Sequence, residues 1–370
     1  MGRRIVLVEP EFPLDGKCRN QARTLPLGLL KLASYHRSLG DEVQLVRGLT
    51  GLEYTPEKVL ITSLFTYWSE LVWETVGYYK ARFPAAEVVV GGIYASLMPD
   101  HCAQSGCDDV FVGLHEEAER LAPALDLVET DFQIINASRG CPRECAFCGV
   151  WRIEPDFTYK QSVVQEIQAN RVLFYDNNLL ANPYIGTILD EIAALRVKGR
   201  VVTCEAQCGI DGRLLTVELA CSLKRARFVY PRIAWDHGYE EHDAVARQIE
   251  MLLNAGYDRR HVYVFMLYNF DLSYEELDKK RRKCFEWGVQ IADCRYRPLD
   301  QIFDHYDPQA WRTGQTSDEY YIHPNWTDAQ IRIFRKQVRE QNIVIRHGFS
   351  QYSREKELAA RKNSTSRGGG

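Results

Sequence analysis

Three closely spaced cysteines are the residues whose types and spacing point most clearly to chemistry. Cys141, Cys145 and Cys148 lie in the segment SRGCPRECAFCG at 138–149, with the pattern C-x3-C-x2-C. The apolar run 132–137 before them predicts a strand that ends just ahead of the cysteines. Three thiolates on one tight loop can hold three irons of a four-iron cluster, which leaves the fourth iron open to a small molecule.

Gly140 suits a loop that must fold its backbone around such a cluster, as does the proline that follows Cys141. Zinc is the main alternative, but structural zinc sites usually pair C-x2-C motifs with a fourth Cys or His nearby, and none is close in this sequence. A disulfide framework does not fit a chain without signs of export. We therefore favour the iron–sulfur interpretation, because the motif and its position after a strand are both specific.

This segment resembles the cluster-binding loop of radical S-adenosylmethionine (SAM) enzymes, in which an aromatic residue precedes the third cysteine, as Phe147 does here. The resemblance implies a [4Fe–4S] cluster with Cys141, Cys145 and Cys148 as its metal ligands and SAM at the open iron. It also implies one-electron cleavage of SAM to a 5′-deoxyadenosyl radical that takes hydrogen from a substrate. A low-potential electron donor of the flavodoxin or ferredoxin type is implied as a partner.

Composition limits where and how the chain acts. Its 370 residues suggest two domains with an appendage, and a net charge of −4 argues against general nucleic-acid binding. Residues 331–370, however, hold ten Lys or Arg and three Asp or Glu. The apolar runs are too short for a signal peptide or a membrane span, so the eleven cysteines are expected in the reducing cytoplasm. Residues 363–370 are predicted to be a disordered tail.

Residues 1–128 are expected to form a first domain. Helices are predicted at 27–39 and 70–82, between strands at 4–8, 42–47, 58–63, 87–90 and 109–112. This alternation predicts an α/β fold with a doubly wound, Rossmann-like parallel sheet. Glycines lie just past strand ends, where a missing side chain lets a ligand approach the backbone.

The first domain resembles the cobalamin-binding-type domain that precedes the barrel in one radical SAM subclass. The matching segments are PLGL at 26–29, ITS at 61–63, GGIY at 91–94 and VGLHEE at 112–117. The resemblance implies cobalamin as a further cofactor, with Ser63, Gly91, Gly92 and Gly113 facing the corrinoid. A Rossmann-like domain without this cofactor is the alternative.

The D-x-H-x-x-G motif that supplies a histidine to cobalt in other cobalamin proteins is absent from this sequence. His101 and His115 are expected to have surface or core roles. The loop 10–24, which is expected to cover the same sheet edge, contains no histidine. We therefore expect base-off cobalamin.

Residues 129–300 are expected to form a partial (β/α)6 barrel of the TIM type, as in the radical SAM family. After 132–137, strands are predicted at 171–175, 200–206, 227–235, 261–267 and 289–295. Helices are predicted at 163–169, 185–196, 216–224, 241–254 and 273–287. Thr216 and Ser273 are expected to cap two of these helices.

Residues 301–370 are expected to form a short C-terminal extension. The segment 301–325 is predicted to be an ordered loop that closes the open side of the barrel. A helix is predicted at 327–341, with Thr327 as its cap. The basic face of this helix is interpreted as solvated, with nucleic-acid binding as the alternative; it carries Arg332, Arg335, Lys336 and Arg339.

Polar residues gather where the predicted barrel strands end, and barrel enzymes place their chemistry there. The resemblance implies that Asp176 and Asn177 contact the SAM amino group. It also implies roles in binding the ribose, the carboxylate and the adenine of SAM for Glu205, Gln207, Asp236 and Met266. Capping of the next helix is the alternative role for the carboxylates.

Two further residues are candidates for catalysis. His237 is a candidate acid or base, because the reference pKa of histidine is near neutral. Cys208 is a candidate for forming or quenching a substrate radical. An auxiliary cluster is an alternative, held by Cys204 and Cys208 with Cys221, Cys284 or Cys294, but ordinary buried cysteine is the favoured interpretation of these residues.

The sequence thus predicts a radical SAM enzyme, with C-methylation of an unactivated carbon as the expected reaction if cobalamin binds. The substrate is expected to be a small molecule or peptide, with RNA as a further option, and no membrane partner is expected. Alternatives are a cobalamin-independent radical rearrangement, cyclisation or oxidation, and a non-enzymatic iron–sulfur or zinc module. A methylthiotransferase-like modifier of RNA or protein is the remaining alternative, with Cys18, Cys102 and Cys107 as its second cluster ligands.

Overall fold

The computed structural model describes residues 2–13 and 25–358. Contacts divide the chain into two compact units. The first unit comprises Met1–Ile134, Arg139–Thr158 and Arg297–His305, and the second comprises Ile135–Ser138, Tyr159–Tyr296 and Tyr306–Gly370. Most of the predicted loop 10–24, with Cys18, and the predicted tail 363–370 lie outside the described residues.

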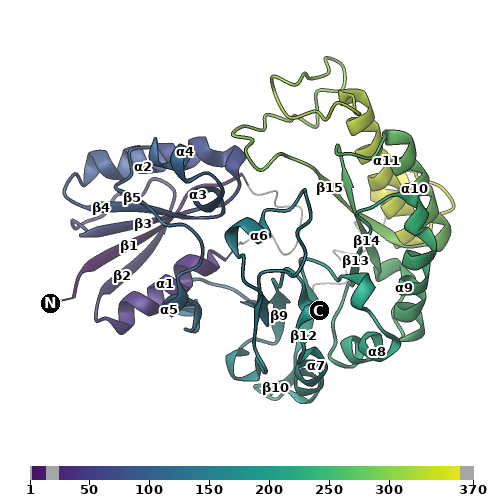
Figure 1. Cartoon of the computed structure of the whole chain (residues 1–370), viewed down its shortest axis with the longest axis horizontal. Coiled ribbons are helices and arrows are strands. Elements are labelled where there is room, and N and C mark those ends of the chain that lie inside the picture. The colour runs from purple at the N-terminus through teal and green to yellow at the C-terminus, as the bar shows by residue number, and fades with distance from the viewer. Residues whose placement is uncertain (1, 14–24, 359–370) are drawn as a thin grey trace. The chain divides into compact units, whose positions relative to one another are not determined.

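A five-stranded parallel sheet forms the centre of the first unit (Figure 1). Its strands follow the order β2-β1-β3-β4-β5, and each neighbouring pair is parallel. The bounds are β1 Arg4–Glu9, β2 Glu42–Arg47, β3 Lys58–Ser63, β4 Glu87–Gly92 and β5 Asp109–Val110. The predicted α/β fold with a parallel sheet is confirmed.

Helices cover both faces of this sheet. Helix α1 (Leu27–Ser38) packs on the face that carries Ile5 and Leu7 of β1. The opposite face, with Val6 and Val8, packs against α2 (Ser69–Arg82), α3 (Ile93–Leu97) and α4 (Pro99–Ala103). Burial on both faces explains why the central strands β1, β3 and β4 contain continuous apolar runs. The short elements are η1 Thr66–Trp68, α5 Glu116–Glu119 and η2 Leu125–Leu127.

Two three-stranded sheets follow in the chain, in the orders β12-β9-β6 and β13-β14-β15. The pairs β9–β12, β13–β14 and β14–β15 are parallel. The bounds are β6 Gln133–Ile135, β9 Arg171–Phe174, β12 Thr203–Ala206, β13 Arg232–Ala234, β14 Tyr263–Tyr268 and β15 Gln290–Arg295. All six lie within or next to the predicted strands.

The helices of the second unit alternate with its strands (Figure 1). They are α7 Ile185–Ala194, α8 Val217–Arg225, α9 His242–Asn254, α10 Tyr274–Trp287 and α11 Asp328–His347. The predicted caps are confirmed, because Thr216 accepts a hydrogen bond from the Leu219 N–H and Ser273 accepts one from the Glu276 N–H. One large hydrophobic cluster joins these helices to the strands.

The predicted helix 163–169 is wrong. The structure has only a 3-10 turn, η3 (Val164–Glu166), followed by extended backbone at Ile167. Val163 and Ile167 are both buried in the core cluster, so the short turn already places the apolar side chains inside. Three β-branched residues in this stretch also lower its helix propensity.

Shorter elements complete the second half of the fold. They are β7 Ser138–Arg139, α6 Val150–Ile153, β8 Thr158–Tyr159, η4 Leu179–Ala181, β10 Arg196–Val197, β11 Arg200–Val201, η5 Gly212–Leu214, η6 Tyr239–Glu241 and η7 Arg259–His261. Strands β10 and β11 pair in the antiparallel sense. Among the described helices, none has the length and apolar character needed to cross a membrane.

Helix α11 begins with a full capping box between Thr327 and Gln330. The interpretation of its basic face as solvated is wrong for Arg332, which is 3% exposed, pairs with Asp328 at 2.9 Å and donates to the Asp307 carbonyl at 2.7 Å. The buried guanidinium therefore ties the helix to the preceding loop.

Farther along α11, the Asn342 amide reaches strand β15. Asn342 accepts from the Ile291 N–H at 2.8 Å and donates to the Ile291 carbonyl at 2.7 Å. It supplies β15, an outer strand of its sheet, with the hydrogen bonds that a neighbouring strand would make.

Candidate functional site

The three motif cysteines lie on the loop between β7 and α6, and all three are half-buried. The Cys148 N–H donates to the Cys145 carbonyl at 3.0 Å. The same carbonyl accepts from the Trp151 indole N–H at 3.3 Å. These bonds fold the backbone between Cys145 and Cys148 into a tight turn.

The start of the cysteine loop requires a glycine. Gly140 has a φ of +72°, and a Cβ at this position would lie 2.4 Å from the Asp156 carbonyl oxygen. Its N–H donates to the Glu154 carboxylate at 2.6 Å. Arg139 pairs with Glu154 at 3.2 Å and with Glu119 at 2.9 Å. The first residues of the loop are thus held by ion pairs of Arg139 and by a backbone conformation that requires glycine at position 140. This agrees with the role expected of Gly140.

Three half-buried thiols on one loop match, in number and chemistry, the protein ligands of a four-iron cluster with one open iron. Within the described residues, no three His, Cys, Asp or Glu side chains are arranged as metal ligands. The fit to a cluster therefore rests on the donor set and the loop backbone. Phe147 is half-buried in the same loop.

Asp176, just after β9, is a buried acceptor rather than an open one. Its side chain takes hydrogen bonds from the Ser138 N–H at 2.6 Å, the Ser138 hydroxyl at 2.7 Å and the Ala137 N–H at 3.1 Å. The residue is 2% exposed, and burial raises the pKa of Asp176 to about 6. Asn177, the next residue, is half-buried.

Glu205 on β12 is also engaged within the protein. It is 6% exposed and forms an ion pair with Arg232 of β13, and Arg232 donates to the Ala206 carbonyl at 3.1 Å as well. Gln207 is half-buried and Cys208 is exposed. Arg232, which sequence reasoning missed, therefore determines how Glu205 is presented.

Asp236 and His237 follow β13 and line a cavity of about 50 Å³. Burial raises the pKa of the half-buried Asp236, and the positive charge of Lys280 opposes this. Gln248 of α9 lines the same cavity, and its Oε1 is buried with no hydrogen-bond partner. Sequence reasoning missed two polar residues near Asp236 and His237. Gln248 lines their cavity, and Lys280 acts on Asp236 through its charge.

Lys280 of α10 fixes this strand end. Its Nζ donates to the Trp235 carbonyl at 2.8 Å and to the His237 carbonyl at 2.7 Å, and the residue is 1% exposed. In the sequence Lys280 is one of several charged residues on a helix, so its burial gave no signal there.

Met266 and two of the additional cysteines belong to the hydrophobic core. Met266, Cys204 and Cys284 are at most 1% exposed within one core cluster. Burial raises the pKa of Cys204 to about 12. These positions agree with the interpretation of Cys204 and Cys284 as ordinary buried cysteines. Cys221 is half-buried, and Cys294 is exposed.

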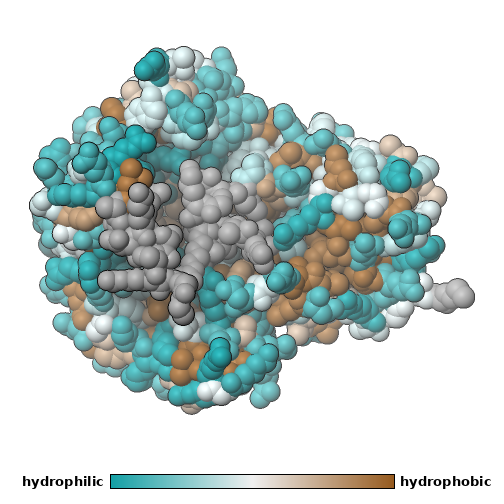
Figure 2. All heavy atoms as spheres, turned by 180° about the vertical axis from the view of Figure 1, so that it is seen from behind, coloured by the Kyte–Doolittle hydropathy of each residue, from teal (hydrophilic) through white to brown (hydrophobic). Residues whose placement is uncertain are grey.

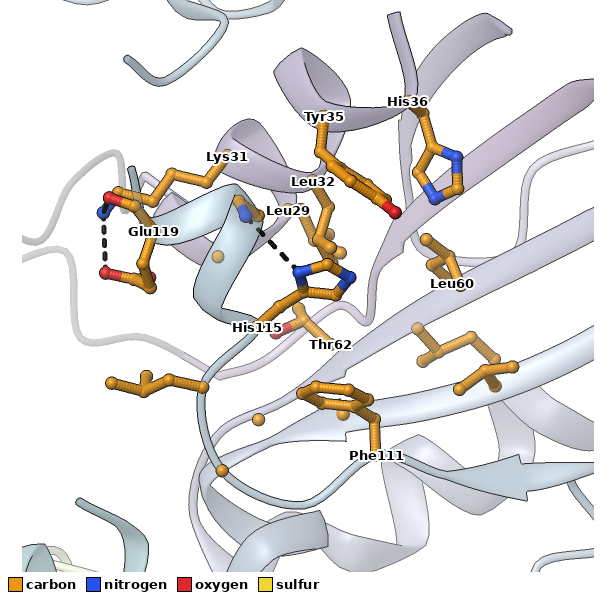
Figure 3. Close-up of a pocket in the computed structure, with 18 of the residues that line it drawn as sticks. Leu29, Lys31, Leu32, Tyr35, His36, Leu60, Thr62, Phe111, His115 and Glu119 are labelled. Atoms are coloured by element: carbon orange, nitrogen blue, oxygen red, sulfur yellow. Dashed lines mark hydrogen bonds and ion pairs between the residues drawn. The ribbon is translucent and has the colours of Figure 1, made fainter. Parts of the chain in front are cut away.

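The first unit contains a separate cavity of about 440 Å³ between α1 and strands β3 to β5 (Figure 3). Leu29, Leu32 and Leu60 give it apolar walls. The His115 ring lies between the Tyr35 and Phe111 rings, with centroid distances of 4.5 and 5.6 Å. Figure 2 also shows hydrophobic side chains gathered on the surface of this unit. The cavity has the size and apolar character of a small-molecule site.

Gly91, Gly92 and Gly113 all line this cavity. A Cβ on Gly91 would make only ordinary contact with Phe111, at 3.6 Å. Gly92 differs, because its φ is +103° and a Cβ would lie 2.3 Å from the Ser63 carbonyl oxygen. Gly91 therefore leaves space open for a ligand, while Gly92 is required by the backbone.

Ser63 does not line the cavity. It is 1% exposed, donates to the Gly91 carbonyl at 2.8 Å and accepts from the Ala95 N–H at 3.0 Å. Its hydroxyl holds β3, β4 and α3 together.

His101 and His115 of this unit have structural partners. His115 Nδ1 accepts from the Ala118 N–H at 3.3 Å and caps α5, so the neutral ring carries its proton on Nε2. His101 Nδ1 lies 2.6 Å from the Tyr94 hydroxyl. Both side chains thus have partners within the protein, and His115 also lines the cavity.

Comparisons with protein-family models and with curated proteins gave no match.

Proposed function

We propose that this chain is a radical SAM enzyme. The observation that carries the proposal is the C-x3-C-x2-C loop, which starts at a left-handed Gly140 and turns back on itself between Cys145 and Cys148. The loop follows β7 directly, so a folded scaffold holds its first residue. Three thiolates suit a cluster that keeps one iron open.

When bound, the [4Fe–4S] cluster would supply an electron for the reductive cleavage of SAM, which yields the radical that takes hydrogen from a substrate carbon. The thiolates of Cys141, Cys145 and Cys148 would hold it. Glu154 would keep the loop start in place through the Gly140 N–H. A low-potential donor of the flavodoxin or ferredoxin type would be the partner, and the cytoplasm the expected location.

Residues that follow strands β9, β12 and β13 are the proposed SAM ligands of this chain. Asn177, Gln207 and Asp236 are half-buried there and carry acceptor oxygens for the amino and hydroxyl groups of SAM. Glu205 would act together with Arg232, its ion-pair partner. His237, exposed at the rim of the small cavity, stays the candidate acid or base, and Cys208 the candidate for radical chemistry.

We also propose that the two three-stranded sheets are parts of one partial barrel. Two isolated parallel bridges support this, between Cys204 and Phe228 and between Ile210 and Ile233. The first bridge places Cys204 of β12 beside Phe228, which precedes β13. The second places Ile210, which follows β12, beside Ile233 of β13. A barrel would gather the residues at the strand ends on one side.

Replacing Cys141, Cys145 and Cys148 with Ala should abolish the brown chromophore, the bound iron and the production of 5′-deoxyadenosine. The matched control replaces three other thiols, Cys107, Cys221 and Cys294, and should keep all three signals. Anaerobic purification, metal analysis and product detection make the test. Zinc in place of iron in the unmodified chain would contradict the proposal, as would SAM cleavage by the triple motif variant.

Cobalamin-dependent C-methylation is the reaction we propose within this class. It is favoured by the cavity of the first unit and by Gly91, where a side chain is missing and the space is open. The substrate would be a small molecule or peptide, or RNA, and it would receive a methyl group on an unactivated carbon. Because Nδ1 of His115 accepts a hydrogen bond at the cap of α5, the neutral ring carries its proton on Nε2 and offers no free nitrogen to cobalt. This supports base-off cobalamin.

Gly91→Leu should fill the cavity and lower the binding of hydroxocobalamin about tenfold or more, because an apolar side chain would occupy the ligand's space. Gly77→Leu is the control, since Gly77 is exposed on α2 and no atom lies within 4 Å of its added Cβ. Gly92 is unsuitable for this test because any side chain there strains the backbone. Absorption spectra and iron content should show corrinoid loss with the cluster kept. If the unmodified chain binds no corrinoid, cobalamin-independent radical chemistry replaces methylation.

A further inference from the structure

We propose that Asp176 positions the cysteine loop by holding residues 137–138, and that it does not contact SAM. This inference rests on the proposed function, because it concerns the loop that would bind the cluster. It changes the role that the sequence suggested for this residue. We call Asp176 and its hydrogen bonds to residues 137–138 the latch.

The latch is built from both oxygens of one carboxylate. Oδ1 accepts from the Ser138 N–H at 2.6 Å and from the Ser138 hydroxyl at 2.7 Å, and Oδ2 accepts from the Ala137 N–H at 3.1 Å. Asp176 is 2% exposed, so these donors, rather than water, satisfy the carboxylate. A SAM amino group would have to displace bonds already made inside the protein.

The same segment is also held from its carbonyl side. The Ala137 carbonyl accepts from the Lys160 N–H at 2.8 Å and from the Asn182 amide at 3.0 Å. Asn182 donates to the Lys160 carbonyl at 3.0 Å as well. Residues 137–138 are therefore fixed on both sides by polar groups within the second unit.

The position of the latch in the chain gives it its effect. Ser138 is followed by Arg139, Gly140 and Cys141, so only two residues separate the latched serine from the first thiol. A fixed backbone just before a metal loop limits the conformations of that loop, and such outer contacts commonly determine how firmly a metal is held. The latch should thus slow the loss of iron.

The test compares Asp176→Ala, Ser138→Ala and the unmodified holoenzyme. Asp176→Ala removes three hydrogen bonds to a charged group, so the rate of iron release to a ferrous chelator should rise about tenfold or more. Ser138→Ala keeps both backbone donors and should have a smaller effect. The affinity for SAM, measured per intact cluster, should stay within about twofold of the unmodified value, since the latch makes no SAM contact.

Val172→Ala is the matched control for general loss of stability. Val172 lies on β9, four residues before Asp176, is fully buried in the core and has an apolar side chain. Below its melting temperature this variant should release iron at the unmodified rate. Faster release from Val172→Ala to the same extent as from Asp176→Ala would overturn the latch.

Two further outcomes separate the latch from the proposed function. Unchanged iron release with SAM affinity about tenfold lower in Asp176→Ala would overturn the latch and return Asp176 to the SAM site, with the radical SAM proposal intact. A chain that binds no iron after anaerobic reconstitution would end the proposed function. Amide hydrogen exchange at Ala137 and Ser138 would still test the latch, which fails if Asp176→Ala leaves the exchange unchanged.

Discussion

Lys280 places a buried ammonium group beneath the end of strand β13. It donates to the carbonyls of Trp235 and His237, on either side of Asp236. Burial lowers the pKa of Lys280 to about 8, and Asp236 acts in the opposite direction. The buried charge of Lys280 thus lowers the free energy of unfolding. Its two hydrogen bonds fix the backbone around Asp236, a candidate SAM ligand.

This arrangement predicts a pH dependence of stability. Between about pH 8 and 10.5 the unfolded chain binds the Lys280 proton and the folded chain does not, so the free energy of unfolding should rise with pH. The difference from the ordinary pKa corresponds to on the order of 3 kcal/mol. Lys280→Met should lose this rise in denaturant titrations across that range. Lys283→Met, at a half-buried position of the same helix, should keep it. Parallel curves for all three proteins would refute the prediction.

Single residues were predictable from the sequence where local geometry sets their role. The cysteine spacing and Gly140 are of this kind, because a loop of a dozen residues determines both. Arg232, Lys280 and Gln248 were not predictable, because their partners lie on other elements. The same reason explains Asp176, whose donors precede it by nearly forty residues.

At the scale of elements, helix α11 completes the sheet that ends at β15. Replacing Asn342 with Leu should leave the Ile291 N–H and carbonyl unsatisfied, with a loss of stability of about 1–3 kcal/mol. Calorimetry should show a lower melting temperature. Ile333→Asn is a control on the exposed side of the same helix and should change it little. Equal melting temperatures for Asn342→Leu and the unmodified chain would show that the edge needs no such cap.

The elements themselves were largely predictable, because apolar runs between turn residues identify strands that are buried on both faces. Thr216 and Ser273 gave two helix starts directly. The stretch 163–169 failed because apolar residues four apart suit a helix, while a single 3-10 turn buries them equally well. Pairing between sheets depends on contacts that no local pattern contains.

At the scale of the whole molecule, the chain passes between its two units several times. Residues 139–158, with the motif cysteines, and residues 297–305 group with the first unit, although they follow and precede parts of the second. The first unit has two hydrophobic clusters and the second unit has one. The predicted boundaries near 128 and 300 divide the chain in linear order. Segments that leave the first unit and later rejoin it are identified only by their contacts.

The two hydrogen bonds between Asn342 and Ile291 also matter during synthesis of the chain on the ribosome. The two residues are 51 positions apart, so a ribosome needs about 3 to 10 s to add the residues between them. During that time β15 has been made but the amide that covers its edge has not. An uncovered strand edge invites pairing with another chain. Neighbouring nascent chains on one messenger RNA would be such partners, so α11 protects this edge only late in synthesis.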